Sequence, residues 1–377
     1  MYFVRAALLS LTVAITASAA SAQVDPVVAR LQVPEGFRIE LFADGVDNAR
    51  SLALGDSGTV FVSSRRGGRV YALAADDRGR LRRKVIADDL QLPNGIACRD
   101  GDLYVAELTR ILRFPDVEAR TGRKQVPQVV YDRLPGERHH GARFIDFGPD
   151  GRLYVSIGAP CNVCERDGFG LIGSLAADGS DWRVEARGIR NSVGFAWHPV
   201  TGNLWFTDNG RDMLGDNRPP GELNRVTARG QHFGFPFCHG GDIADPQYGG
   251  ERDCRDFVAP AQKLGPHVAP LGVLFYTGKM FPESYRNQVF IAEHGSWNRS
   301  QKIGYRITLV RLNGSDAVSY APFAEGWLHD GGQVSGRPVD LLQLPDGSLL
   351  VSDDLQGRIY RITYHEPLAG IERRQAR

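Results

Sequence analysis

Beyond its first 22 residues the sequence has no long hydrophobic run, and it has no excess of charge of either sign. Lys and Arg number 45 and Asp and Glu number 44, which gives a formal net charge of +1 at pH 7. Without a second apolar run, the sequence gives no support for a membrane span. Without a basic stripe or a charged tail, it argues against nucleic acid or an anionic membrane as a partner.

The first residues have the layout of a secretory signal peptide. Arg5 is followed by an apolar run over residues 6–17 and by small residues at positions 20–22. We therefore expect a signal peptide over 1–22 and a mature chain that starts near Gln23. The protein is expected to be periplasmic or secreted, with residues 23–377 forming a single domain.

Five cysteines in an oxidising compartment indicate two disulfides and one free thiol. Cys161 and Cys164 are close enough in sequence to pair locally, and Cys238 and Cys254 bracket a glycine-rich stretch. Cys98 lies in an apolar, strand-like run and is the expected free thiol. The Cys161 to Cys164 spacing also fits haem attachment, but a glutamate follows where that motif has histidine.

A short phrase recurs along the chain: a turn glycine, one further residue and then two to five apolar or aromatic residues. Most copies follow one short strand and precede another, and long amphipathic helical windows are nearly absent. A spacing of roughly 40 to 60 residues suits four-stranded propeller blades. The sequence therefore predicts an all-β fold, a six-bladed β-propeller with four-stranded blades. The copies begin at Gly58, Gly101, Gly151, Gly202, Asn287 and Gly347.

The interval from Gly202 to Asn287 is longer than the others. It is rich in Asp, Gly and Pro and holds two of the cysteines, so we expect an insertion over about 208–270. Residues 37–42 form a spare strand, which we expect to complete the last blade beside the C-terminal strands and to leave no open sheet edge. An irregular β-sandwich is the alternative fold, but sandwiches rarely repeat one phrase six times.

Polar residues that precede inner strands are expected to meet, because the loops of a propeller gather at one mouth of its channel. Converging arginines repel one another unless an anion lies between them, since guanidinium stays charged and binds carboxylates bidentately. A histidine with a pKa near neutral suits a general base. The pattern predicts a polyanionic ligand beside such a base, with ordinary surface residues as the alternative. The residues are Asn94 in the second blade, His139, His140 and Arg143 in the third, Arg190 and Asn191 in the fourth and Arg337 in the last.

A stretch rich in hard oxygen donors runs from Asp208 to Asn217. Asp212 and Asp216 within it are candidate calcium ligands, because Ca²⁺ prefers carboxylate and carbonyl oxygens. The spacing is not that of an EF-hand, and Asp, Asn and Gly are also common in turns. A calcium site and a simple turn therefore both stay open.

With these residues in view, the chain resembles the soluble quinoprotein sugar dehydrogenases, the glucose/sorbosone dehydrogenase family, and within it the sorbosone dehydrogenase branch. The resemblance covers essentially the whole mature chain. It is carried by the phrases His139-x-x-x-Arg143, Gly-x-Arg190-Asn191, Asp208-Asn-Gly-Arg, Gly295-Ser-Trp-Asn-Arg and Arg337-Pro-Val-Asp.

The resemblance implies a six-bladed propeller that binds pyrroloquinoline quinone, with calcium at the channel mouth. By position, His139 matches the family's general base and Arg190 matches the arginine near the quinone carbonyl. Gly210 and Arg211 match the pair whose backbone carbonyls hold calcium. The expected cofactor contacts are Asn94, Arg143, Asn191, Arg299 and Arg337.

Three positions depart from the family pattern. Pro93 stands where the glucose enzymes have glutamine, and Arg138 stands where an acidic residue usually precedes the histidine. The stretch Trp297-Asn298-Arg299 lacks the lysine that contacts the quinone carboxylates, so Arg299 is the expected stand-in. These departures bear on the orientation of His139 and on quinone affinity.

The sequence thus predicts an exported quinone-dependent dehydrogenase that oxidises an aldose or a sorbosone-like sugar aldehyde. Its electrons are expected to pass to a cytochrome, a quinone or an artificial dye. One alternative is a calcium-dependent lactonase, which needs several side-chain carboxylates on the metal. Another is a non-catalytic propeller that binds carbohydrate or a protein.

Overall fold

The computed structural model describes residues 25–121 and 125–367, so the predicted signal peptide lies outside the described residues. Within those ranges, no helix has the length and apolar character that a membrane crossing requires. The described helices are three-residue 3-10 segments. They are η1 (Val28–Arg30), η2 (Glu118–Arg120), η3 (Cys254–Asp256), η4 (Glu283–Tyr285) and η5 (Asp330–Gly332).

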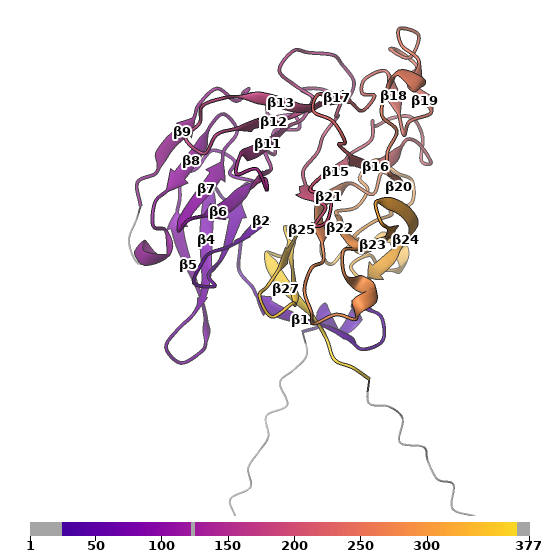
Figure 1. Cartoon of the computed structure of the whole chain (residues 1–377). Helices are drawn as coiled ribbons and strands as arrows, with labels where there is room; N and C mark the ends of the chain where they lie inside the picture. Colours follow the sequence, from indigo (N-terminus) through magenta and orange to yellow (C-terminus); the bar gives the residue numbers. More distant parts are fainter. Residues whose placement is uncertain (1–24, 122–124, 368–377) are drawn as a thin grey trace, which may run out of the picture.

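Six small sheets surround a central channel as a six-bladed β-propeller, which confirms the predicted fold (Figure 1). The first strand of each blade lines the channel. Blade 1 contains β2 (Ala49–Leu54), β3 (Val60–Ser64), β4 (Arg69–Ala75) and β5 (Leu81–Ala87). Blade 2 contains β6 (Ile96–Arg99), β7 (Asp102–Ala106), β8 (Ile111–Phe114) and β9 (Gln128–Tyr131). Blade 3 contains β10 (Ile145–Phe147), β11 (Leu153–Ile157), β12 (Leu171–Leu175), β13 (Arg183–Arg187) and β17 (Gln231–His232).

The second half of the chain builds the other three blades. Blade 4 contains β14 (Phe195–Trp197), β15 (Leu204–Asp208), β16 (Pro220–Arg225) and β20 (Gln262–Pro266). Blade 5 contains β21 (Pro270–Phe275), β22 (Val289–Glu293), β23 (Arg306–Asn313) and β24 (Asp316–Ala324). Blade 6 contains β25 (Pro338–Gln343), β26 (Leu349–Asp353), β27 (Arg358–Tyr364) and β1 (Phe37–Ala43).

The ring is closed by strands from opposite ends of the sequence. β1 pairs antiparallel with β27, with Ile39 opposite Ile362, and Figure 1 shows the two strands together at the base of the ring. This pairing confirms the prediction that residues 37–42 complete the last blade. It also hydrogen-bonds the exposed side of the C-terminal strand, which would otherwise be an open sheet edge.

The repeated phrase has a local conformational cause. The residue that begins each copy has a positive φ, which glycine adopts readily and asparagine tolerates. This turn feeds the second strand of each blade, and every residue of those six strands is buried. Neighbouring blades cover both faces of these strands, so each carries a run of at least three consecutive apolar residues rather than an alternating pattern. The φ values are 89° for Gly58, 80° for Gly101, 78° for Gly151, 69° for Gly202, 60° for Asn287 and 88° for Gly347.

The long interval between blades 4 and 5 is only partly an insertion. The predicted range 208–270 includes β16 and β20, which are regular strands of blade 4. Between them, β17 joins blade 3 through a parallel pairing with β13. The hairpin of β18 (Cys238–His239) and β19 (Ile243–Ala244) follows β17.

The prediction of two disulfides and one free thiol is confirmed. Disulfides join Cys161 to Cys164 and Cys238 to Cys254. Cys98 is free and partly buried at the end of β6. Burial raises the pKa of its thiol, so Cys98 stays protonated and unreactive at neutral pH.

Candidate active site

Loops that precede the inner strands surround a cavity of about 630 Å³, within the size range of small-molecule sites. The cavity brings together side chains from separate blades, as the sequence analysis expected. Five other residues named there are not among those that line it. The predicted site residues that do line the cavity are His139, His140, Arg190, Asn191, Gly210, Asp212 and Arg337.

Arg190 is buried at the cavity wall and held by acceptors on two loops. Its Nη2 donates to Asp212 Oδ2 at 2.7 Å and to Asn162 Oδ1 at 2.9 Å, and its Nε donates to the Asn162 carbonyl. Asn162 lies inside the Cys161 to Cys164 disulfide loop. The disulfide therefore orders a loop that fixes the direction of the Arg190 guanidinium.

His139 and His140 lie side by side, with ring centroids 4.0 Å apart. Burial and the charge of Arg190 lower the pKa of His139 from its usual 6.5, with Asp212 acting in the opposite direction. Burial lowers the pKa of His140 to about 2, and its Nδ1 lies 2.8 Å from the Ala159 carbonyl, which requires an Nδ1–H donor. Both imidazoles are therefore neutral at pH 7, and each keeps a nitrogen that can accept a proton.

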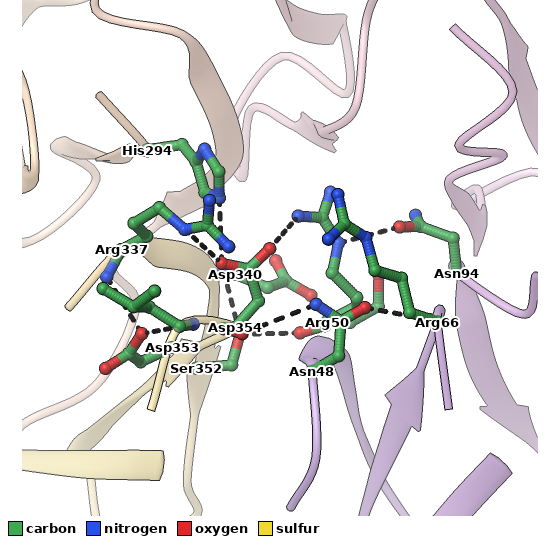
Figure 2. A network of polar contacts seen from close by, with 12 residues as sticks. Asn48, Arg50, Arg66, Asn94, His294, Arg337, Asp340, Ser352, Asp353 and Asp354 are labelled. Atoms are coloured by element: carbon green, nitrogen blue, oxygen red, sulfur yellow. Dashed lines mark hydrogen bonds and ion pairs between the residues drawn. The ribbon is translucent and has the colours of Figure 1, made fainter. Parts of the chain in front are cut away.

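Asp354, directly after β26, gathers three donors from three blades at the cavity wall (Figure 2). Its Oδ1 accepts from Arg337 Nε at 2.8 Å and from His294 Nε2 at 3.0 Å. Its Oδ2 accepts from Arg50 Nη1 at 3.0 Å. Figure 2 shows Arg337 and His294 at one carboxylate oxygen and Arg50 at the other. One carboxylate therefore orients two guanidinium groups that line the cavity.

Two amide side chains at the cavity have a buried oxygen without a hydrogen-bond partner. These atoms are Asn191 Oδ1 and Asn298 Oδ1. Asn298 Nδ2 donates to Asp212 Oδ1 at 3.0 Å, so its orientation is fixed. A buried polar atom without a partner is costly, and such atoms at a cavity wall fit a ligand that supplies the missing donors or a cation.

The floor of the cavity is apolar. Ala142, Val193, Leu271 and Val339 form one buried cluster, and the first three of them line the cavity. They lie at or just before the starts of four inner strands, β10, β14, β21 and β25. Such a floor suits the face of a flat ring system and keeps water away from one side of it.

Arg143 and Asn94 do not line the cavity; they support residues that do. The Arg143 side chain is buried, and its Nη2 and Nε donate to the carbonyls of Pro135 and Leu108 at 2.6 and 3.2 Å. It thus holds the loop that carries His139. Asn94 is also buried, and its Oδ1 accepts from Arg50 Nε at 3.0 Å.

Arg299, Arg211 and Asp216 also lie outside the cavity lining. Arg299 Nε donates to the Asp216 carbonyl at 2.9 Å, and the Asp216 carboxylate accepts from the Ser300 backbone N–H. These bonds tie the 208–217 loop to the 297–301 loop. Arg211 pairs with Asp245, and that contact fixes the backbone next to Gly210.

Within the described residues, no group of three or more His, Cys, Asp or Glu side chains could hold a metal ion. Asp212 and Asp216, proposed from sequence as calcium ligands, are engaged with different partners. A calcium ion at this cavity would therefore depend on backbone carbonyls such as that of Gly210 and on oxygens of a bound ligand. Gly210 lines the cavity and packs closely against the next strand, because a Cβ there would lie 2.7 Å from the Pro220 carbonyl oxygen.

Several cavity residues were missed by the sequence analysis although a signal existed. Arg50 is the second residue of β2, the inner strand of blade 1, close to the positions that Arg190 and Arg337 take just before theirs. A second signal is the residue directly after the second strand of each blade. In several blades this residue lines the cavity or contacts a residue that does. These residues are Arg65, Glu107, Gly158, Asn209, His294 and Asp354.

Two family models match the chain. One, described as TrAA12-like, covers residues 31–245. The other, described as Glucose / Sorbosone dehydrogenase, covers residues 174–361. Together they span nearly all of the propeller.

Curated relatives include proteins of bacterial and fungal origin. An uncharacterized protein of Borreliella burgdorferi is 33% identical over 359 residues, which cover 91% of this chain and 93% of that protein. A pyrroloquinoline quinone-dependent pyranose dehydrogenase of Coprinopsis cinerea is 26% identical over 290 residues, which cover 66% of this chain and 35% of that enzyme. The chain thus matches about a third of the length of the Coprinopsis enzyme.

Solved structures share the fold at low sequence identity. The holo form of the pyranose dehydrogenase PQQ domain from Coprinopsis cinerea has a TM-score of 0.76 and 21% identity, covering 88% of this chain and 97% of that chain. The calcium structure of a Trichoderma reesei enzyme of Carbohydrate-Active Enzymes family AA12 has a TM-score of 0.77 and 21% identity, covering 89% and 97%. These similarities establish a common architecture.

Proposed function

Because the chain belongs to the glucose/sorbosone dehydrogenase family, we propose that it is an exported dehydrogenase that oxidises an aldose or a sorbosone-like sugar aldehyde with pyrroloquinoline quinone and calcium. The observation that carries the proposal is the meeting of His139, Arg190 and Arg337 at one cavity. A neutral base, a fixed cation and an anion-binding arginine are the groups that such a reaction requires.

The cavity's own chemistry fits the cofactor. Arg337 and Arg50 keep Nη donors that no described residue accepts, and these donors suit carboxylate groups. Asn191 Oδ1 and Asn298 Oδ1 are buried without partners. When bound, pyrroloquinoline quinone supplies the two-electron acceptor, and calcium polarises it as a Lewis acid.

In the proposed reaction, His139 accepts the proton of the substrate hydroxyl. Its pKa lies below 6.5, so the imidazole is unprotonated at neutral pH and available as a base. Arg190, fixed by Asp212 and Asn162, stabilises negative charge that develops beside it. Because Arg190 makes these bonds without a ligand, it needs no reorganisation when the substrate arrives.

Calcium is assigned to the backbone carbonyl of Gly210, because Arg211, the second residue expected from the sequence, lies outside the cavity lining. The Gly210 backbone faces the cavity, and the Arg211 side chain is held by Asp245. The shortage of side-chain carboxylates among the described cavity residues supports a quinone enzyme over the lactonase alternative, which needs several such ligands on the metal.

Reconstitution of the ligand-free protein tests the proposal. Addition of calcium and pyrroloquinoline quinone is expected to give a saturable absorbance change and sugar-dependent reduction of an artificial dye. Arg337→Ala is expected to raise the quinone Kd at least about tenfold, since a charge-assisted hydrogen bond contributes about 1.5–3 kcal/mol. Arg78→Ala is the matched control, because Arg78 is exposed in the β4–β5 turn and does not line the cavity.

Three outcomes would contradict the proposal. No absorbance change would exclude the quinone. Quinone-independent hydrolysis of a lactone would favour the lactonase. Quinone binding without sugar-dependent dye reduction would favour a non-catalytic propeller.

A further inference from the structure

Three arginines at the cavity lack the acidic partners that the other cavity arginines have. Arg65 and Arg66 follow β3, Arg138 precedes His139, and all three line the cavity. Within the described parts of the chain, none of their guanidinium groups makes an ion pair or a side-chain hydrogen bond. In contrast, Arg190 pairs with Asp212, and Arg50 and Arg337 share Asp354.

This group of three arginines, Arg65, Arg66 and Arg138, carries uncompensated charge. Burial, followed by repulsion from Arg50, Arg66 and Arg138, lowers the pKa of Arg65 to about 10. Asp354 raises the pKa of Arg65, but its carboxylate already accepts hydrogen bonds from Arg50, Arg337 and His294. The ligand-free cavity thus holds like charges whose repulsion an anion would relieve.

The position of Arg65 favours a small anion over a macromolecular surface. Its Nε is buried and has no hydrogen-bond partner. A partner protein that contacts the rim could reach Arg66 and Arg138, which are exposed, but not a buried nitrogen. A ligand inside the cavity can contact all three groups.

Depth separates Arg66 and Arg138 from the proposed cofactor contacts Arg190 and Arg50, whereas Arg65 is partly buried and Arg337 is 30% exposed. The side chains of Arg190 and Arg50 are 4% and 9% exposed, and each is held by an aspartate. Arg66 and Arg138 are exposed at the mouth, beside the loop of the proposed base His139. Deep and fixed groups suit a resident cofactor, whereas outer groups suit a ligand that enters and leaves at each turnover.

We propose that Arg65, Arg66 and Arg138 form a subsite for the carboxylate or phosphate group of an anionic sugar. The inference rests on the proposed function and narrows its substrate to a sugar that carries a negative charge away from the oxidised carbon. Guanidinium groups bind both anions bidentately, so uronic acids and sugar phosphates share the recognition chemistry. The oxidised group is the one already assigned to His139, so the balance of protons and electrons is unchanged.

Matched sugars test the subsite. The reconstituted enzyme is assayed with D-glucuronate, D-glucose 6-phosphate and D-glucose, which differ at C6. The kcat/KM for at least one anionic sugar is expected to exceed that for glucose about tenfold or more, and the excess should fall with rising salt. A larger kcat/KM ratio to glucose for glucuronate indicates a carboxylate subsite, and a larger ratio for glucose 6-phosphate indicates a phosphate subsite.

The variants Arg66→Ala and Arg138→Ala are expected to bring the ratio of anionic to neutral kcat/KM close to one, with the quinone Kd within about twofold of the parent. Arg78→Ala, the exposed control, should keep the parental ratio. Calorimetric titration of glucuronate and glucose 6-phosphate into the protein gives a readout that does not depend on turnover. Saturable binding that either variant weakens about tenfold supports the subsite even if no sugar is oxidised.

Equal kcat/KM values for the charged and neutral sugars, together with absent calorimetric binding, would overturn the subsite and leave the dehydrogenase assignment intact. A rise of the quinone Kd in both variants with the sugar ratio unchanged would assign the arginines to the cofactor instead. An effect confined to reduction of an acidic protein acceptor would assign them to a docking surface.

Discussion

His294 Nε2 lies 3.0 Å from Asp354 Oδ1, so an imidazole that follows β22 in blade 5 meets a carboxylate that follows β26 in blade 6. Burial lowers the pKa of His294 even though Asp354 opposes this shift. The imidazole is therefore neutral at pH 7 and donates Nε2–H. The bond joins neighbouring blades at the cavity and leaves the negative charge of Asp354 for Arg50 and Arg337.

Removing that carboxylate is expected to destabilise the fold. Burial opposes ionisation of Asp354, but His294, Arg50 and Arg337 together hold its pKa well below its usual range. Asp354→Asn should lower the free energy of unfolding at pH 7 by about 3 kcal/mol, because it leaves two arginines without their partner. Urea unfolding followed by tryptophan fluorescence measures this change.

The pH dependence gives a second check on Asp354. A depressed carboxylate pKa contributes stability above the unfolded-state pKa of about 3.9, and this contribution disappears as the pH falls through the lower folded-state pKa. The difference between parent and Asp354→Asn should therefore shrink below about pH 4. Asp316→Asn is the control: its side chain is 87% exposed and 3.8 Å from Arg225, so its effect should stay within about 0.5 kcal/mol. Equal effects of the two substitutions would contradict the role of Asp354.

His139→Ala is expected to lower kcat at least about a hundredfold, the usual contribution of a general base. The quinone absorbance change should persist, because the variant keeps the arginines that are proposed to bind the cofactor. In the parent enzyme, kcat/KM should rise with pH and level off below about pH 6.5, since the pKa of His139 is lowered from that value. His365→Ala, at an exposed position in the C-terminal region, is the control. Unchanged turnover in His139→Ala would remove His139 as the base.

Gly210→Ala is expected to weaken activation by calcium. An added Cβ would lie 2.7 Å from the Pro220 carbonyl oxygen and 3.0 Å from Pro219 Cγ, so the backbone must shift. The calcium concentration for half-maximal dye reduction should rise at least about tenfold, because misplacement by about 1 Å costs that much or more. Gly250→Ala is the control, since its Cβ would meet no atom within 4 Å. A calcium response equal to that of the parent would contradict the assignment of the Gly210 carbonyl.

The Cys161 to Cys164 disulfide is expected to support activity through Asn162. Replacing both cysteines with alanine should cost about 2 kcal/mol of stability by loop-closure entropy. It should also lower kcat about tenfold, because Asn162 accepts two of the hydrogen bonds that orient Arg190.

Removal of the Cys238 to Cys254 disulfide provides the comparison for that experiment. It closes a longer loop, with a sequence separation of 16, and its removal should cost about 3 kcal/mol with a smaller effect on kcat. If kcat follows stability in both double variants, the disulfide at Cys161 has no specific role in holding Arg190.

The fold could be predicted because its signals are local. Each blade repeats a left-handed turn residue followed by a buried strand, and both are readable within about ten residues, as at Gly58 and Gly347. The presence of two disulfides followed from the number and spacing of the cysteines and from the expected oxidising compartment. The positions before inner strands also pointed to the cavity, which is why Arg190 and Arg337 were found.

The sequence by itself determined a ring of six blades and the blade ends at which its polar residues would gather. Only the tertiary structure decided which of those side chains turn inward. Arg143 stands just before β10 and Arg50 at the start of β2, yet carbonyls of Leu108 and Pro135 hold Arg143 in the wall, whereas Asp354 draws Arg50 to the cavity. The direction of a long charged side chain depends on acceptors that neighbouring blades supply, and those acceptors are distant in sequence.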